Sequence, residues 1–248
     1  MSNVNLKKIK SVHFIGIGGI GVSAIARMML LNGKKVSGSD SVPSPVTERI
    51  KRLGARIYIG HQESNISDDI DIVVYSPAVP GNNPELVRAR RENIPAYSYP
   101  EMLGRISKGM DTIAISGTHG KTTTTAMIAE IMIAAKKDPT VVVGSFLKKQ
   151  KDNFVPGNSK YFVVEACEYR RSFLNLSPQI LVITNIDNDH LDYYGNLKNI
   201  QKAFNEMVLK VPRDGFIICN PRDKRVKPAL KGVRGTIIDY TKTKTNIT

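Results

Sequence analysis

One short loop in this sequence has the residue types of a phosphate-binding site. Residues 115–125 are Ile-Ser-Gly-Thr-His-Gly-Lys-Thr-Thr-Thr-Thr. The usual phosphate loop has a glycine, four further residues and then Gly-Lys-Ser/Thr. Here Gly120-Lys121-Thr122 is present, but Ile115 holds the expected glycine position and the extra glycine is Gly117. The pattern therefore indicates a shortened phosphate loop.

The chemistry of such a loop predicts two ligands, ATP and Mg²⁺. Backbone amides and the dipole of the following helix hold phosphates. Lys121 would neutralise the transferring phosphoryl group, and the hydroxyl of Thr122 would ligate the metal. The predicted ATP contacts are Gly117, Thr118, His119, Gly120, Lys121, Thr122 and Thr123.

Two side chains elsewhere are predicted to join this site. Glu165 ends the apolar run 161–165, and His190 follows another apolar run. Ligands collect at the edge of a parallel sheet where such strands end. We therefore predict Mg²⁺ ligation by Thr122, Glu165 and His190, and catalytic roles for Lys121, Glu165 and His190. Glu168 is the neighbouring alternative to Glu165, and a histidine in such a loop is more often a capping or hydrogen-bonding residue.

A second glycine-rich loop lies near the start of the chain. Gly16-Ile-Gly-Gly-Ile-Gly21 fits G-x-G-x-x-G between a predicted strand and a predicted helix. Asp40 ends the second predicted strand, where an acid commonly meets a ribose or base. The pattern predicts a diphosphate-bearing nucleotide but does not distinguish NAD from others, and a tight turn without a ligand is the alternative.

Alternating strand and helix patterns predict the scaffold that positions these residues. Apolar β-branched runs are followed by helical patterns throughout, which is typical of parallel βαβ units. We predict an α/β protein with a Rossmann-like parallel-sheet domain at 1–108 and a partial P-loop-type α/β ATP-binding domain at 109–248. The predicted strands are 11–15, a second that begins with 35–38 and ends at Asp40, 71–75, 111–116, 140–143, 161–165, 179–184, 216–219 and 236–239.

Composition excludes several classes of protein. The 248 residues include two cysteines, too few for a disulfide framework, which fits a reducing cytosol. The basic excess behind the net charge of +14 is scattered, and its local concentration at 222–244 lacks a series of interleaved aromatic residues for base stacking, so we predict no nucleic-acid partner. Glycines and Arg27 interrupt the apolar run 12–31, which argues against a signal peptide. We predict a cytoplasmic protein that does not insert into membranes.

Six segments occur in the order seen in the Mur ligases, and together they resemble that family over nearly the whole chain. They are His13-Phe-Ile-Gly-Ile-Gly-Gly-Ile-Gly-Val-Ser-Ala-Ile-Ala26, Ser37-Gly-Ser-Asp40, Tyr75-Ser-Pro-Ala-Val-Pro80, Gly117-Thr-His-Gly-Lys-Thr-Thr-Thr-Thr125, Glu165-Ala-Cys-Glu168 and Thr184-Asn-Ile-Asp-Asn-Asp-His190. The resemblance is greatest to the member that joins L-alanine to UDP-N-acetylmuramate. It implies that the first loop holds a UDP-sugar rather than NAD, through Gly16, Gly18, Gly19, Ile20, Gly21, Asp40 and Ser76.

The resemblance also implies a reaction. In the family, ATP phosphorylates the lactyl carboxylate of UDP-N-acetylmuramate, and the amine of L-alanine attacks the acyl phosphate. Family members continue for about as long again, so we expect a truncated form whose third domain, which carries adenine-binding and most amino-acid-binding groups, is absent or supplied elsewhere. The alternatives are a catalytically silent UDP-sugar-binding module and, less favoured, an NAD-dependent dehydrogenase.

Overall fold

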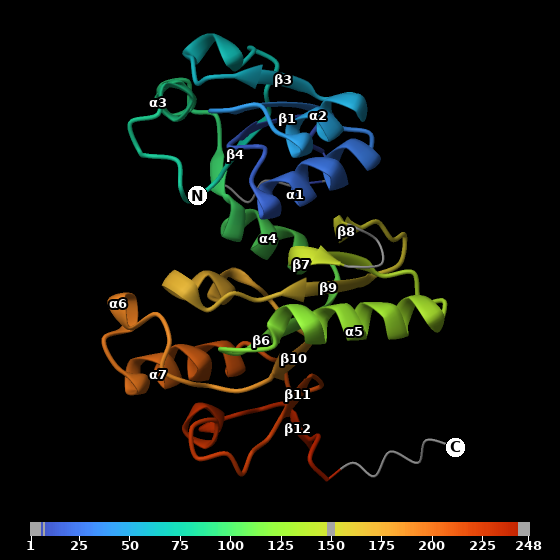
Figure 1. The fold of residues 1–248 in the computed structure, drawn as a ribbon, viewed down its shortest axis with the longest axis vertical. Helices are drawn as coiled ribbons and strands as arrows, with labels where there is room; N and C mark the ends of the chain where they lie inside the picture. The colour runs from blue at the N-terminus through green and yellow to red at the C-terminus, as the bar shows by residue number, and fades with distance from the viewer. Residues whose placement is uncertain (1–5, 7, 148–151, 243–248) are drawn as a thin grey trace. The chain divides into compact units, whose positions relative to one another are not determined.

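The computed structural model describes residues 6, 8–147 and 152–242, and in it the chain divides into two compact units, Met1–Ile106 and Ser107–Thr248 (Figure 1). Each unit has its own sheet with helices packed on it. The predicted α/β class is therefore confirmed. Among the described helices, none is long and apolar enough to cross a membrane. The functions assigned to the parts 1–108 and 109–248 stay predictions.

The first unit has a parallel sheet of strand order β3-β2-β1-β4-β5. β2 and β4 pair with β1 on opposite sides, so the direction in which strands are added reverses at β1. In open α/β sheets, ligands bind at such a switch point, beyond the carboxyl ends of the strands. The elements are β1 (Ser11–Ile15), α1 (Ile20–Leu31), β2 (Lys35–Asp40), α2 (Pro45–Arg52), β3 (Arg56–Ile59), the 3₁₀ helix η1 (Glu63–Asn65), β4 (Ile72–Tyr75), α3 (Pro84–Arg91), β5 (Ala96–Ser98) and α4 (Tyr99–Ser107), which leads into the second unit.

The second unit has a mixed sheet of strand order β12-β11-β10-β6-β9-β7-β8. All its strand pairs are parallel except β7 with β8, which form an antiparallel pair at one edge. The sequence analysis predicted parallel βαβ units and did not include this antiparallel edge pair or strand β8. The elements are β6 (Asp111–Ser116), α5 (Lys121–Ala134), β7 (Thr140–Leu147), β8 (Asp152–Val155), β9 (Tyr161–Glu165), η2 (Tyr169–Asn175), β10 (Ile180–Ile183), α6 (Leu191–Tyr194), α7 (Leu197–Val208), β11 (Phe216–Cys219), η3 (Lys227–Leu230) and β12 (Thr236–Asp239).

Apolar packing fixes α5 on the sheet of the second unit, along which it runs in Figure 1. Ala129 is fully buried against Ile115, Val163 and Val182 from the three central strands. Burying these β-branched side chains removes apolar surface from water and so stabilises the unit. Because α5 begins directly after the phosphate loop, this packing also fixes the position of that loop.

In the first unit, β2 and the glycine-rich loop approach each other so closely that one position of β2 must be a glycine. A Cβ added at Gly38 in β2 would lie 2.7 Å from the carbonyl oxygen of Phe14 and 2.6 Å from Cδ1 of Ile17. Ile17 belongs to the glycine-rich loop and is fully buried. Gly38 therefore makes the space in which the loop packs onto the sheet.

We expect Gly38→Ala to lower the free energy of unfolding of the first unit by about 1–3 kcal/mol, because the added methyl overpacks against backbone that cannot move away. Urea unfolding measures this. Gly81→Ala is the matched control, because no atom lies within 4 Å of its added Cβ, and its effect should stay within about 0.5 kcal/mol. Equal stability of the two variants would contradict the close approach.

Candidate functional site

The phosphate loop after β6 is held by the segment that follows β10. The amide of Thr118 donates to the carbonyl of Asn185 at 3.1 Å, and the amide of His119 donates to the Asn185 side chain at 2.9 Å. The Thr184 hydroxyl donates to the His119 carbonyl at 2.6 Å. Gly117 has a φ of +137°, and a Cβ there would lie 2.0 Å from Oγ1 of Thr184. Only glycine fits this position, and His119 shapes the turn through its backbone.

The amides of Thr118 and His119 are thus bonded within the chain, which leaves the start of α5 to face a phosphate. Gly120 precedes the helix with a φ of +81°. Lys121, Thr122 and Thr123 form the first turn, whose N–H groups have no acceptor inside the helix. Such a turn, with the positive end of the helix dipole, is suited to bind an anion.

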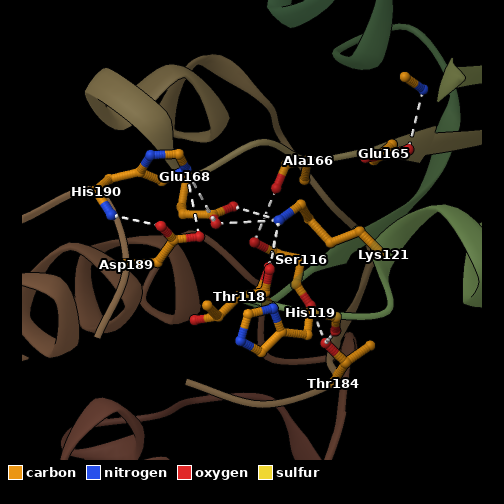
Figure 2. Close-up of polar contacts among 12 residues, drawn as sticks. Ser116, Thr118, His119, Lys121, Glu165, Ala166, Glu168, Thr184, Asp189 and His190 are labelled. Atoms are coloured by element: carbon orange, nitrogen blue, oxygen red, sulfur yellow. Dashed lines mark hydrogen bonds and ion pairs between the residues drawn. The ribbon is translucent and has the colours of Figure 1, made fainter. Parts of the chain in front are cut away.

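The side chain of Lys121 lies against the loop and a buried carboxylate (Figure 2). Its Nζ donates to the carbonyls of Gly117 at 2.6 Å and Thr118 at 3.1 Å, and it lies 3.0 Å from Glu168. The Glu168 side chain is only 2% exposed. A buried carboxylate needs such a cation, because removal of either partner would leave an uncompensated charge.

Thr122 and Glu165 are brought together as predicted. The Thr122 hydroxyl donates to Oε2 of Glu165 at 3.0 Å, and the Gly144 amide donates to the same oxygen at 3.0 Å. A Cβ at Gly144 would lie 3.1 Å from the carboxylate, so the glycine permits this approach. Thr122 and Glu165 supply the hard oxygen donors that Mg²⁺ prefers.

His190 lies with a different carboxylate from the one predicted. Figure 2 shows it grouped with Glu168 and Asp189, while Glu165 lies apart. Nε2 of His190 is 3.8 Å from both Glu168 and Asp189, and these three side chains could hold a metal ion. The ring of Tyr169 packs on the imidazole with centroids 4.6 Å apart. His190 therefore lies beside Asp189 and beside Glu168, which the sequence analysis gave as the alternative to Glu165.

In the first unit, the end of β2 holds the glycine-rich loop. The carbonyl of Ser39 accepts from the amides of Gly16 at 2.9 Å and Ile17 at 3.0 Å. Oδ2 of Asp40 accepts from the Gly18 amide at 2.8 Å. Asp40 was predicted to contact a ribose or base. In the structure its carboxylate holds the glycine-rich loop through the Gly18 amide.

The remaining predicted residues of this loop lie at the same switch point. Gly16 has a φ of +75°, and a Cβ there would lie 3.1 Å from Cβ of Ser76, which follows β4. The Gly19 amide donates back to Gly16, and Ile20 is 43% exposed at the start of α1. Gly21 lies in the first turn of α1 against the ring of Tyr99. The structure therefore brings the predicted loop residues and Ser76 to one edge of the sheet.

Several residues that shape these sites were not predicted. Asn185, Thr184 and Gly144 act through short-range contacts with the phosphate-loop region, and Tyr194 donates from its hydroxyl to the buried carbonyl of Glu168 at 2.5 Å. The polar stretch after β10 was a detectable signal for Asn185. Nothing in the sequence marks the partner of Tyr194.

Comparison with known proteins identifies the family. The model of the Mur ligase family, catalytic domain, matches residues 11–110, and that of the Mur ligase middle domain matches 115–248. The chain belongs to the Mur ligase family.

Individual relatives agree with this assignment. This Mur ligase chain is 46% identical over 232 residues to a UDP-N-acetylmuramate–L-alanine ligase of Clostridium perfringens, covering 93% of the chain and 50% of the relative. Its identity to the same-named protein of Clostridium tetani is 48%, covering 95% of the chain and 52% of the relative. The chain thus spans about half the length of the curated relatives it matches.

Solved structures show the same fold. The UDP-N-acetylmuramate-alanine ligase of Thermotoga maritima matches with a TM-score of 0.76 at 35% identity, over 89% of this chain and 51% of that one. A UDP-N-acetylmuramate:L-alanyl-gamma-D-glutamyl-meso-diaminopimelate ligase from Neisseria meningitides matches with a TM-score of 0.84 at 27% identity, over 93% of this chain and 78% of that one.

We expect Tyr194→Phe to lower the free energy of unfolding of the second unit by about 1 kcal/mol, because the Glu168 carbonyl loses its donor. Tyr193→Phe is the matched control, since its side chain is 45% exposed. Chemical denaturation at neutral pH compares the two variants, and an equal effect would contradict the role of the Tyr194 hydroxyl.

The Tyr194 hydroxyl also predicts that the stability of the second unit depends on pH. Burial raises the pKa of Tyr194 from 10.0 to about 12. Because the unfolded phenol ionises first, the stability that the neutral Tyr194 contributes is complete below pH 10 and is lost as the pH rises toward 12. Over this range the stability difference between wild type and Tyr194→Phe should shrink, and a constant difference would contradict the raised pKa.

Proposed function

We propose that this chain supplies the UDP-sugar-binding and ATP-binding parts of a UDP-N-acetylmuramate–L-alanine ligase, an enzyme of peptidoglycan precursor synthesis in the cytoplasm. The observation that carries the proposal is the position of Lys121 beside Glu168, and of Thr122 beside Glu165, at the edge of the second sheet in a Mur ligase chain. The names of the clostridial relatives support the choice of substrates. No nucleic acid is involved and no part of the chain inserts into a membrane in this proposal.

In the first unit, the proposed ligand is UDP-N-acetylmuramate. The first turn of α1 and the loop from Gly16 to Gly21 would face its diphosphate, with Ser76 beside Gly16 at the switch point. Asp40 keeps the loop in shape through the Gly18 amide. A second nucleotide, NAD, is not needed in this reaction, and the phosphate loop of the second unit would have no role in a dehydrogenase.

In the second unit, the proposed ligands are ATP and Mg²⁺. Thr122 and Glu165 fit the metal because their oxygens lie 3.0 Å apart and are of the hard type that it prefers. His190 lies with Glu168, so its part in holding metal is proposed together with that carboxylate. When bound, Mg²⁺ supplies charge neutralisation on the phosphate oxygens.

The proposed reaction transfers the γ-phosphoryl group of ATP to the lactyl carboxylate. The amine of L-alanine then attacks the acyl phosphate, and an amide, ADP and phosphate result. Carboxylate and phosphate repel each other, so the chain must place positive charge between them. Lys121 can supply it, since its ammonium needs only to leave Glu168 and the loop carbonyls to meet a phosphate. The first-turn amides of α5 orient the phosphates.

Phosphate release by the purified chain with MgATP, UDP-N-acetylmuramate and L-alanine tests this function. Turnover that requires all three substrates and is abolished in Lys121→Ala, where the phosphoryl group loses its cation, would show that the chain is a working ligase by itself. Lys160→Ala is the control, because Lys160 pairs with Asp111 at the amino end of β6.

Silence in this assay would separate the two candidates. If the wild-type chain gives no phosphate but UDP-N-acetylmuramate raises its melting temperature, the chain is a sugar-nucleotide module whose chemistry needs a further domain supplied elsewhere. Neither turnover nor thermal protection would contradict both candidates.

We expect Glu165→Gln to raise the Mg²⁺ concentration needed for half-maximal binding of an ATP analogue by about tenfold or more, because the metal loses an anionic ligand. Titration calorimetry at increasing Mg²⁺ measures this. The exposed acid Asp192, changed to Asn, is the control and should leave the requirement unchanged. A larger effect of Glu168→Gln than of Glu165→Gln would assign the metal to the other carboxylate.

A further inference from the structure

The first unit contains a buried carboxylate that the proposed function does not use. Glu85, in the first turn of α3, has a completely buried side chain. Its Oε2 accepts from the Ser39 hydroxyl at 2.5 Å, and its Oε1 accepts from the Asn65 amide at 2.5 Å. The rings of His13 and His61 lie 3.7 and 3.4 Å from Oε2. Four side chains from different elements therefore converge on one acid.

The surroundings of Glu85 favour its ionised form in spite of its burial. Burial raises its pKa, but the nearby His13 ring and the hydrogen bonds from Ser39 and Asn65 outweigh this and lower the pKa below its ordinary value. A buried charge costs free energy even when it is well paired, and apolar residues of similar volume often serve stability as well. Stability alone therefore does not explain this cluster.

Ser39 connects this charge to the glycine-rich loop. Its side chain bonds to Glu85, while its carbonyl accepts from the amides of Gly16 and Ile17. The next residue, Asp40, accepts from the amide of Gly18. The end of β2 thus holds three successive loop amides, and Glu85 holds the end of β2 from the buried side.

We propose that Glu85 is a positioning residue for the sugar nucleotide: its buried carboxyl group fixes Ser39, and Ser39 fixes the glycine-rich loop that receives the diphosphate. The inference rests on the proposed function of that loop. Glu85 contacts no ligand in this arrangement and acts through Ser39. Its effect is therefore on the shape of the loop and hence on affinity.

The two acceptor oxygens of Glu85, and not only its shape, are used. The hydroxyl of Ser39 and the amide of Asn65 approach different carboxylate oxygens. Glutamine offers one acceptor oxygen and would turn its own N–H group toward the other donor. Asn65 cannot relieve this by turning over, because its Nδ2 also donates to the carbonyl of Gly60 at 3.1 Å.

The test compares Glu85→Gln with Asp71→Asn in the full chain. Asp71 is a matched control, because its carboxylate accepts from the amides of Lys10 and Ser11 at the opposite, amino end of β1. Calorimetric titration with UDP-N-acetylmuramate should give a Kd about tenfold higher for Glu85→Gln, the size expected for a lost charged hydrogen bond. Asp71→Asn should lower the melting temperature but leave the Kd unchanged.

Hydrogen exchange gives a readout that general destabilisation does not move. In Glu85→Gln, the amides of Gly16 and Ile17 should exchange faster relative to those of β4, and in Asp71→Asn they should not. Faster exchange together with weaker binding supports the proposal. Wild-type affinity in Glu85→Gln, or an equal loss of affinity in Asp71→Asn, overturns it.

Two further outcomes are distinguishable. Failure of the wild-type chain to bind UDP-N-acetylmuramate overturns the proposed function of the loop and the role of Glu85 in it, whereas tight binding by both wild type and Glu85→Gln overturns the role of Glu85 alone. If Glu85→Gln does not fold, Ser39→Ala takes its place, since it removes only the connecting hydroxyl. It should show the same two changes, and unchanged affinity and exchange would contradict the proposal.

Discussion

Both glycine-rich loops depend on one kind of interaction: each loop is bonded to the end of the strand beside it. In the first unit, Ser39 and Asp40 at the end of β2 bind three loop amides. In the second, Asn185 after β10 binds the amides of Thr118 and His119. Backbone groups that leave a parallel sheet lose their ladder partners, and these contacts replace them. The positions of both candidate sites follow from this constraint.

These contacts determine which backbone amides can still bind a ligand. Amides that hold the loop to the neighbouring strand are already bonded, so the amides of the following helix turn are those that can face phosphate. This explains why the glycines matter more for space than for contact. Gly117 and Gly38 lie where a Cβ would strike Thr184 and Phe14, respectively. A loop of this kind is rigid before any ligand arrives, which lowers the entropic cost of binding.

The sequence predicted the elements that carry strong local signals and missed those that depend on distant partners. The strands that precede each loop and the helices that follow them came from glycine turns next to apolar runs, and they agree with β1, α1, β6 and α5. Helix α7 was missed although Asn196 caps it and one face is apolar. The antiparallel pairing of β8 depends on edge contacts with β7, which apolar patterns do not encode.

The candidate site shows the same limit in its side chains. Spacing placed Glu165 and His190 at one sheet edge, but it could not decide which of two acids three residues apart meets the histidine. That choice depends on the chain after β9, where Arg170 and Arg171 have φ values of +48° and +60° and turn the backbone sharply. Because L-residues rarely adopt this conformation, it persists only where neighbouring contacts hold it, and the pairing of Arg171 with Glu206 in α7 is one such contact.

Both units contain a buried carboxylate, and the two carboxylates differ in their partners. Glu168 is nearly buried beside Lys121, which a phosphate can draw away, so its pairing is exchangeable. Glu85 is fully buried among Ser39, Asn65 and two histidines, none of which a ligand needs to move. A paired charge that must be released suits a site where charge moves during reaction, whereas a charge fixed by several neutral donors suits a support that holds its shape. The difference in partners therefore distinguishes the two candidate sites.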